Sequence, residues 1–139
     1  PPHIFLANPN APTGLALPLR DIERIVAGNP DSVVVIDEAY VDFGGTSCYR
    51  LIESYVNLLV VRTFSKSRCF AGGRLGYIMG DPALIADLEK LRCSTNPYNI
   101  NRMTSAAGCA VLAENDYYME NCRTIAHTRK FTAQELQKL

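Results

Sequence analysis

The feature that most constrains the fold is an uninterrupted run of mostly β-branched residues, SVVVI, at positions 32–36. A strand without polar alternation is typical of a parallel sheet that is covered on both faces. Similar apolar runs occur at residues 3–7, 57–61 and 75–79, and the segment 17–27 has helical periodicity. Strands alternating with helices predict an α/β fold, in which a mostly parallel sheet lies between two helical layers.

The second half of the chain is predicted to be helical. Asp81 is a suitable N-cap before a helix that starts at Pro82, residues 102–113 form a helix rich in small side chains, and residues 116–139 form a long amphipathic helix. The chain opens directly with strand-like sequence and stops within this last helical pattern. We therefore expect it to be a fragment of a longer protein.

Composition narrows the classes of partner. The 139 residues are 47% hydrophobic and 20% charged, which is enough apolar sequence for a buried core. The 14 basic and 14 acidic residues cancel, so no nucleic-acid partner and no membrane surface is expected. The apolar runs are too short to span a bilayer. Small-molecule partners remain the expectation.

The cysteine pattern favours a reducing compartment. The count of five is odd and no two cysteines have CxxC spacing, so neither a disulfide framework nor a zinc site is expected. His3 and His127 have no metal-ligand partner at helical spacing. We expect no metal and a cytoplasmic location.

Three loops are predicted to meet at one edge of the sheet. Residues 8–14, 37–43 and 63–74 each follow a predicted strand. In open α/β sheets the ligand site lies outside the carboxyl ends of the strands. This convergence makes a functional interpretation of the loops stronger than any one of them would allow.

The third loop carries a lysine among hydroxyls. When it is desolvated or close to other cations, the Lys66 amine can lose its proton and attack a carbonyl. Thr63, Ser65 and Arg74 can hold a phosphate, because hydroxyls donate hydrogen bonds and a guanidinium binds two oxygens at once. Taken alone, this loop would be interpreted more simply as an ordinary solvent-exposed turn.

The second loop supplies an acid and a phenol. Asp37 can pair with a protonated ring nitrogen and turn a cofactor ring into an electron sink, and Tyr40 can bond an oxygen on the same ring. Taken alone, Asp37 is more simply a cap and Tyr40 a core residue whose hydroxyl reaches the surface. Together with Lys66 and a phosphate cradle, they are the parts that pyridoxal 5'-phosphate requires.

The motifs as a set resemble the fold-type I pyridoxal-phosphate-dependent aminotransferases of class II, and within them the histidinol-phosphate aminotransferases. The likeness covers essentially the whole chain, and its order and spacing are more specific than any single motif. It rests on four segments: NAPTG at 10–14, DEAYVDF at 37–43, RTFSKS at 62–67 followed by AGGRLGY at 71–77, and PYNIN at 97–101.

The resemblance implies a role for each candidate residue. Lys66 would be the catalytic lysine that forms the Schiff base and moves the proton, Asp37 would bind the pyridine nitrogen, and Tyr40 would bind the ring oxygen. The phosphate would be held by Thr63, Ser65 and Arg74. The implied reaction is amino transfer between histidinol phosphate (imidazole-acetol phosphate after transfer) and 2-oxoglutarate (glutamate after transfer) in L-histidine biosynthesis.

The resemblance also implies an organisation. Residues 1–115 would be part of the large cofactor-binding domain, a three-layer α/β/α unit, and residues 116–139 the long helix toward a small C-terminal domain. The parent protein is expected to be a homodimer and an enzyme. This fragment lacks the family's upstream phosphate turn, its stacking aromatic and a downstream arginine, so we expect it to be inactive or nearly so alone.

The chain departs from the family pattern in two places. Ala11 stands where the family usually has an asparagine that bonds the ring oxygen, and Asn10, one position earlier, is the remaining candidate for that contact. Gly73 stands where a leucine or methionine is common.

Alternatives of two kinds remain. One is a related enzyme of the same fold, such as a threonine-phosphate decarboxylase or an aromatic aminotransferase; the absence of tryptophan from segment 97–101 argues against the decarboxylase. The other is a non-catalytic relic of the fold. A general nucleotide-binding domain is weaker still, because neither GxGxxG nor GxxxxGK[ST] is present.

Overall fold

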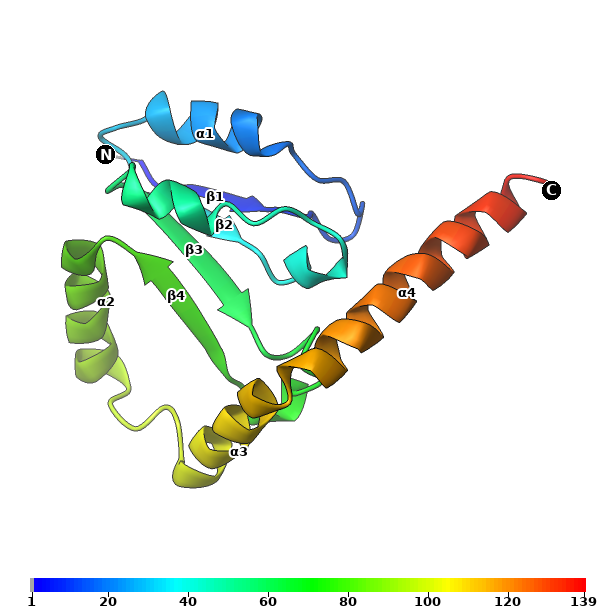
Figure 1. Ribbon diagram of the computed structural model, residues 1–139. Helices are drawn as coiled ribbons and strands as arrows, with labels where there is room; N and C mark the ends of the chain where they lie inside the picture. The colour runs from blue at the N-terminus through cyan, green and yellow to red at the C-terminus, as the bar shows by residue number, and fades with distance from the viewer. Residues whose placement is uncertain (1) are drawn as a thin grey trace.

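The computed structural model describes residues 2–139 (Figure 1). A four-stranded sheet occupies the first part of the chain and three helices follow it. The elements in order are β1 (Ile4–Ala7), α1 (Leu19–Ala27), β2 (Val34–Asp37), η1 (Val41–Phe43), η2 (Tyr49–Glu53), β3 (Leu58–Thr63), η3 (Ala71–Gly73), β4 (Gly76–Gly80), α2 (Pro82–Thr95), α3 (Arg102–Ala113) and α4 (Asn115–Leu136).

The sheet is mostly parallel. Its order is β1-β2-β3-β4, with β1, β2 and β3 parallel and β4 antiparallel to β3. The register aligns Ala7 with Asp37 and Asp37 with Val61, so β1 and β2 end at the same level and β3 continues beyond them to Thr63. This alignment brings the loops that follow them to one edge of the sheet.

One face of the sheet carries the core. The apolar side of α1, with Ile22 and Val26, packs on the strand residues that point toward it, and η2 covers the same face (Figure 1). The strand side chains of this face alternate with their neighbours along each strand, as pleating requires. The fully buried members of the cluster are Ile22, Val26, Val34, Ile36, Cys48, Leu58 and Val60.

The other face is more open within the described residues. Phe5, which is 73% exposed, and Ile78 lie on it, and α2 packs beside β4. Val35, which points to this face, is half-buried, whereas Val34 and Ile36 are buried. The β-branched run therefore forms the predicted strand, and its core side is the side under α1.

The three C-terminal helices begin at identifiable caps or turns. Asp81 accepts a hydrogen bond from the Ala83 amide (2.8 Å) at the start of α2, as predicted, and Asn101 caps α3 through the Thr104 amide (2.8 Å). The long helix α4 extends well beyond the sheet (Figure 1). Residues 2–139 contain no helix with the length and apolar character that crossing a bilayer requires.

The α/β class and the mostly parallel sheet are confirmed. The predicted strands and helices are present, with bounds that shift by one to three residues. The 3₁₀ helices η1, η2 and η3 lie in the connections between the strands. Pro1, the first residue of the predicted large domain (residues 1–115), lies outside the described residues.

Candidate functional site

The predicted meeting of three loops occurs at the carboxyl edge of β1, β2 and β3. The amide of Asn8 donates to the carbonyl of Asp37 (2.9 Å), and the amide of Glu38 donates to the carbonyl of Val61 (2.9 Å). The strand pairing therefore continues past the last strand residues. It fixes where each loop leaves the sheet.

Lys66 and Tyr40 come together across two of these loops. The Lys66 Nζ lies 5.4 Å from the centroid of the Tyr40 ring, within the range of a cation–π contact. Tyr40 is half-buried and Lys66 is exposed. The amine is thus held close to a phenol and open to a molecule arriving from solvent.

Thr63 and Ser65 form a pair of adjacent hydroxyls. Their Oγ atoms are 2.9 Å apart, and the Ser65 amide donates to the Thr63 Oγ1 (3.1 Å). Hydroxyls and an amide gathered in this way can donate to one anion. The two residues predicted to hold a phosphate therefore lie side by side.

Arg74 has an unusual backbone conformation, and its guanidinium binds a carbonyl of its own turn. Its φ of 51° places it in the left-handed region, where few non-glycine residues lie, and its Nη1 donates to the Ala71 carbonyl (3.1 Å). Its side chain is exposed. The backbone next to it is tied to the hydroxyl pair, because the Leu75 carbonyl accepts from Thr63 Oγ1 (3.4 Å) and the Phe64 amide (3.0 Å).

Asp37 presents its carboxylate at the open side of the edge. One oxygen accepts a hydrogen bond from the Ala39 amide (2.9 Å), and the side chain is exposed. The remaining lone pairs face outward. A carboxylate in this state can accept a proton or a hydrogen bond from a bound molecule.

Asn10 lies at a cavity of about 720 Å³ beside the same edge. Its amide nitrogen donates to Thr13 Oγ1 (2.7 Å), so it is engaged within its own turn. The cavity is also lined by Tyr40 and by Arg129 of α4, whose Nη1 donates to the Phe43 carbonyl (3.2 Å). Lys66 and Asp37 do not line this cavity, so it adjoins the lysine edge and does not contain it.

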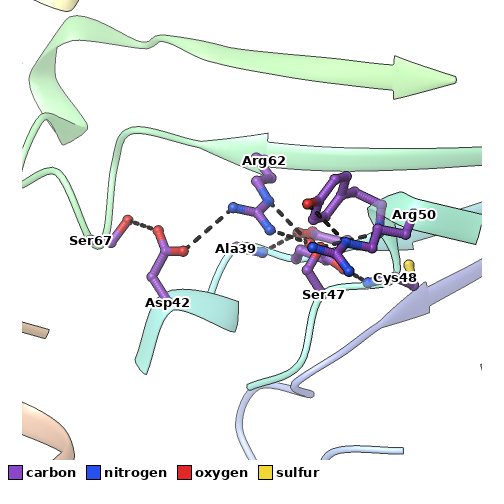
Figure 2. Close-up of polar contacts among 10 residues, drawn as sticks. Ala39, Asp42, Ser47, Cys48, Arg50, Arg62 and Ser67 are labelled. Carbon is purple, nitrogen blue, oxygen red and sulfur yellow. Dashed lines mark hydrogen bonds and ion pairs between the residues drawn. The ribbon is translucent and has the colours of Figure 1, made fainter. Parts of the chain in front are cut away.

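A chain of buried and half-buried charged and polar side chains runs beneath the edge (Figure 2). We call Glu38, Arg62, Asp42 and Ser67 the polar relay. Arg62 donates through Nε to Glu38 Oε2 (3.0 Å), its Nη2 forms an ion pair with the same oxygen (2.9 Å), and its Nη1 donates to Asp42 Oδ1 (3.4 Å). Ser67 Oγ donates to Asp42 Oδ2 (2.6 Å). The relay therefore connects the loop after β2 to the loop after β3.

Glu38 is the most enclosed member of the relay, at 3% exposed. Besides Arg62, it accepts hydrogen bonds from Ser47 Oγ (2.7 Å) and from the Cys48 amide (2.7 Å). Both oxygens of the Glu38 carboxylate therefore have partners, which offset the cost of removing its charge from water. This is the condition under which a buried carboxylate is tolerated.

The relay perturbs the titration of its neighbours. Burial, and then the negative charge of Glu38, raises the pKa of the Cys48 thiol to about 12. Burial acts to lower the pKa of Arg62, but the charge and hydrogen bonds of Glu38 outweigh it, so that pKa is raised. The thiol is therefore kept neutral while the guanidinium stays charged.

Sequence reasoning did not assign the relay. Its bonded pairs are separated by 20 to 25 positions along the chain, so no local motif joins them. One signal was available: Arg62 directly follows the apolar pair Val60 and Val61, and an arginine at the end of a buried strand needs a partner. No group of three His, Cys, Asp or Glu side chains placed to bind a metal ion occurs in the described part of the chain.

Comparison with known proteins gives a consistent result. A family model described as aminotransferase class I and II matches residues 2–139. The chain is 52% identical over 126 residues to histidinol-phosphate aminotransferase 2 of Burkholderia lata, a match that covers 91% of this chain and 36% of that relative. The chain therefore spans a little over a third of the length of the curated relatives it matches.

Two solved structures are similar in shape. The histidinol-phosphate aminotransferase of Clostridium acetobutylicum gives a TM-score of 0.84 at 27% identity, covering 98% of this chain and 42% of that one. The histidinol-phosphate aminotransferase of Sinorhizobium meliloti, solved in complex with pyridoxal-5'-phosphate, gives 0.77 at 34% identity, covering 93% and 35%.

Proposed function

Because the chain belongs to the aminotransferase class I and II family, we propose that it is part of a pyridoxal-phosphate-dependent aminotransferase. The proposed reaction moves the amino group between histidinol phosphate and 2-oxoglutarate, in L-histidine biosynthesis. The observation that carries the proposal is the meeting of Lys66 and Tyr40 at the edge where Asp37 ends β2 and Thr63 ends β3.

The residues at this edge suit the chemistry of the cofactor. The paired hydroxyls of Thr63 and Ser65 can donate to a phosphate, and the outward lone pairs of Asp37 can hold a proton on a ring nitrogen. When bound, pyridoxal phosphate supplies an electron sink for negative charge that develops on the substrate carbon. The two hydroxyls thus suit the phosphate of such a molecule, and Asp37 suits its ring nitrogen.

Each residue then has a defined task. Lys66 would supply the amine that binds the cofactor carbonyl and the base that moves a proton at the substrate carbon. Tyr40 would donate its phenol to the ring oxygen, and Arg74, whose Nη1 donates to the Ala71 carbonyl in the structure, would add its charge to the phosphate. Asn10 is the weakest member, since its amide is already bonded to Thr13.

The proposal includes the organisation of the whole protein. Residues 1–115 belong to the large cofactor domain, and residues 116–139 lead to a small domain. We propose a homodimer located in the cytoplasm. In support, large apolar side chains are exposed on the C-terminal part of the chain, where a further domain or a second subunit can cover them: Tyr98, Met103, Leu112, Phe131 and Leu136.

The first test is chemical labelling. The full-length protein is incubated with pyridoxal phosphate and reduced with borohydride, and modified lysines are mapped by mass spectrometry. Lys90, Lys130 and Lys138 are exposed and serve as internal controls. Selective labelling of Lys66 is expected. Equal labelling of all four lysines would overturn the assignment.

The second test separates the substrates. The full-length protein is expected to transaminate histidinol phosphate with 2-oxoglutarate, and Lys66→Arg is expected to abolish turnover while leaving the fold intact by circular dichroism. Threonine phosphate and aromatic amino acids are assayed in parallel. Preference for either would replace the proposed substrate, and loss of all turnover in the unmodified protein would favour a non-catalytic member of the fold.

A further inference from the structure

The polar relay lies one position away from the proposed site residues along the chain. Glu38 directly follows Asp37, Arg62 directly precedes Thr63, and Ser67 directly follows Lys66. In two of these pairs the relay member is the more enclosed: Glu38 is buried beside the exposed Asp37, and Ser67, at 4% exposed, lies beside the exposed Lys66, whereas Arg62 and Thr63 are both half-buried. Anchoring one neighbour inside the protein fixes the direction in which the other points out.

The relay has little freedom to rearrange. Its two acids and one arginine satisfy one another, and a shift of either loop would leave a buried charge without a partner. All four relay residues line a cavity of about 20 Å³, room for roughly one water molecule, together with Thr63, Phe64, Arg68, Tyr77 and Leu112. The contacts within the relay hold the two loops in one arrangement.

Lys66 depends on this arrangement for its position. Its side chain is flexible and exposed, and the contact that the structure gives its amine is the approach to the Tyr40 ring. The ring belongs to the loop after β2 and the amine to the loop after β3. The Ser67–Asp42 hydrogen bond joins those two loops immediately next to Lys66 and two residues after Tyr40.

We propose that Ser67 and Asp42, held by Arg62 and Glu38, are positioning residues that set the Lys66 amine over Tyr40. The inference rests on the proposed function, because it concerns the amine chemistry assigned to Lys66 there. None of the four relay residues needs to touch the cofactor or the substrate. Their effect is exerted through the backbone on either side of Lys66.

The test uses Ser67→Ala in the full-length protein. The variant removes the 2.6 Å hydrogen bond to Asp42 and nothing from Lys66 itself. We expect the rate of Lys66 labelling by pyridoxal phosphate and borohydride to fall roughly 10- to 100-fold, the range that follows when a reacting group is displaced by about 1 Å. The midpoint of the absorbance–pH titration of the bound cofactor should shift as well. Ser67→Thr keeps the hydroxyl and should restore both.

Ser47→Ala is the matched control. It removes a hydrogen bond of similar length (2.7 Å) from the same relay, but at the Glu38 end, away from Lys66. Its labelling rate should stay close to that of the unmodified protein. Thermal unfolding of both variants shows whether they are equally folded. If Ser67→Ala does not fold, Asp42→Asn, which retains an acceptor for Ser67, is measured in its place and should slow labelling by a smaller factor.

The outcomes separate the two proposals. Equal labelling rates in Ser67→Ala and the unmodified protein, or an equal loss in Ser47→Ala, would overturn the positioning role. If pyridoxal phosphate does not select Lys66 in the unmodified protein, the proposed function fails instead. In that case the rate at which a small acylating reagent modifies Lys66 still tests the relay: a change in Ser67→Ala that Ser67→Thr reverses supports it, and no change overturns it.

Discussion

The sheet region, residues 4–80, and the helical region, residues 82–139, differ in how their apolar side chains are used. The buried hydrophobic side chains of the described chain all lie in the sheet region, except for Cys122. In the helical region Leu91 is 62% exposed and Ile125 is 53% exposed, although both belong to apolar stripes of the kind that pack against a core. Apolar side chains with this periodicity are thus buried in the sheet region, whereas in the helical region Leu91 and Ile125 stay exposed, although α2 packs beside β4 and α4 beside η1.

The two regions are also stabilised by different kinds of interaction. The sheet region is stabilised by burial and by the polar relay. Helix α2 has its cap Asp81, exposed ion pairs and a contact with β4, and α3 has its cap Asn101. Exposed ion pairs contribute little to stability. Mutations of similar chemistry should therefore have unequal effects in the two regions.

The largest effect is expected for Arg62→Ala in the sheet region. It leaves the carboxylate of Glu38 buried without its counter-charge, which should cost about 3–5 kcal/mol of unfolding free energy. Arg123→Ala, in the exposed ion pair of α4, is the counterpart and should change the urea midpoint of this chain little. Equal losses from both would contradict the contrast between the regions.

A large effect is also expected for Ile36→Ala. The side chain is fully buried under α1, so its truncation should cost about 2–5 kcal/mol, measured by urea unfolding of this chain. Ile125→Ala on α4 should stay within about 0.5 kcal/mol, as for other exposed positions. A substantial loss in Ile125→Ala would show that this side chain contributes to packing despite being 53% exposed.

A moderate effect is expected at the start of α2. Asp81→Ala removes the acceptor for the Ala83 amide and should cost about 0.5–2 kcal/mol. Asp87→Ala, an acid in the same helix without a capping contact, should cost less. Comparable losses in circular dichroism and urea unfolding would mean that charge, not capping, stabilises this helix.

The smallest effect is expected from thiol reagents at Cys48. Alkylation requires the thiolate, and the pKa of Cys48 is raised to about 12 by burial and by Glu38, so mass spectrometry should find Cys48 unmodified at pH 8 while the exposed Cys93 reacts. The folded thiol keeps its proton up to about pH 12, whereas the unfolded thiol releases it near pH 9. The contribution of Cys48 to the free energy of unfolding is therefore fully present below pH 9. It is lost as the pH rises toward 12. Rapid reaction of Cys48 at pH 8 would contradict this environment.

Much of the fold could be predicted because it depends on local patterns. The run at 32–36 predicted β2, and Asp81 before Pro82 predicted the start of α2. The exposure of Leu91 could not be predicted, because a helical stripe shows only that a face is apolar and not what covers it.

For the site, the rule that parallel strands end together predicted that the three loops meet, and Lys66 lies close to Tyr40 in the structure. The hydrogen bond between the Thr63 and Ser65 hydroxyls was not predicted, and the roles assigned to these residues stay predictions. The pairing of Glu38 with Arg62 was not predictable, because it requires the register of β2 on β3. The turn of Arg74 toward Ala71 depends on a left-handed backbone that its sequence does not favour.

The register of β2 has a consequence for errors in folding. Asp37 and Glu38 are adjacent acids, and a slip of one residue against β1 and β3 would exchange the directions in which they point. The Glu38 carboxylate, which pairs with Arg62, would then face solvent. The Asp37 carboxylate, which is proposed to bind a ligand, would be buried without a partner. A misregistered chain would lose its stability and its chemistry together, so this sheet does not offer a route to a stable protein with a scrambled site.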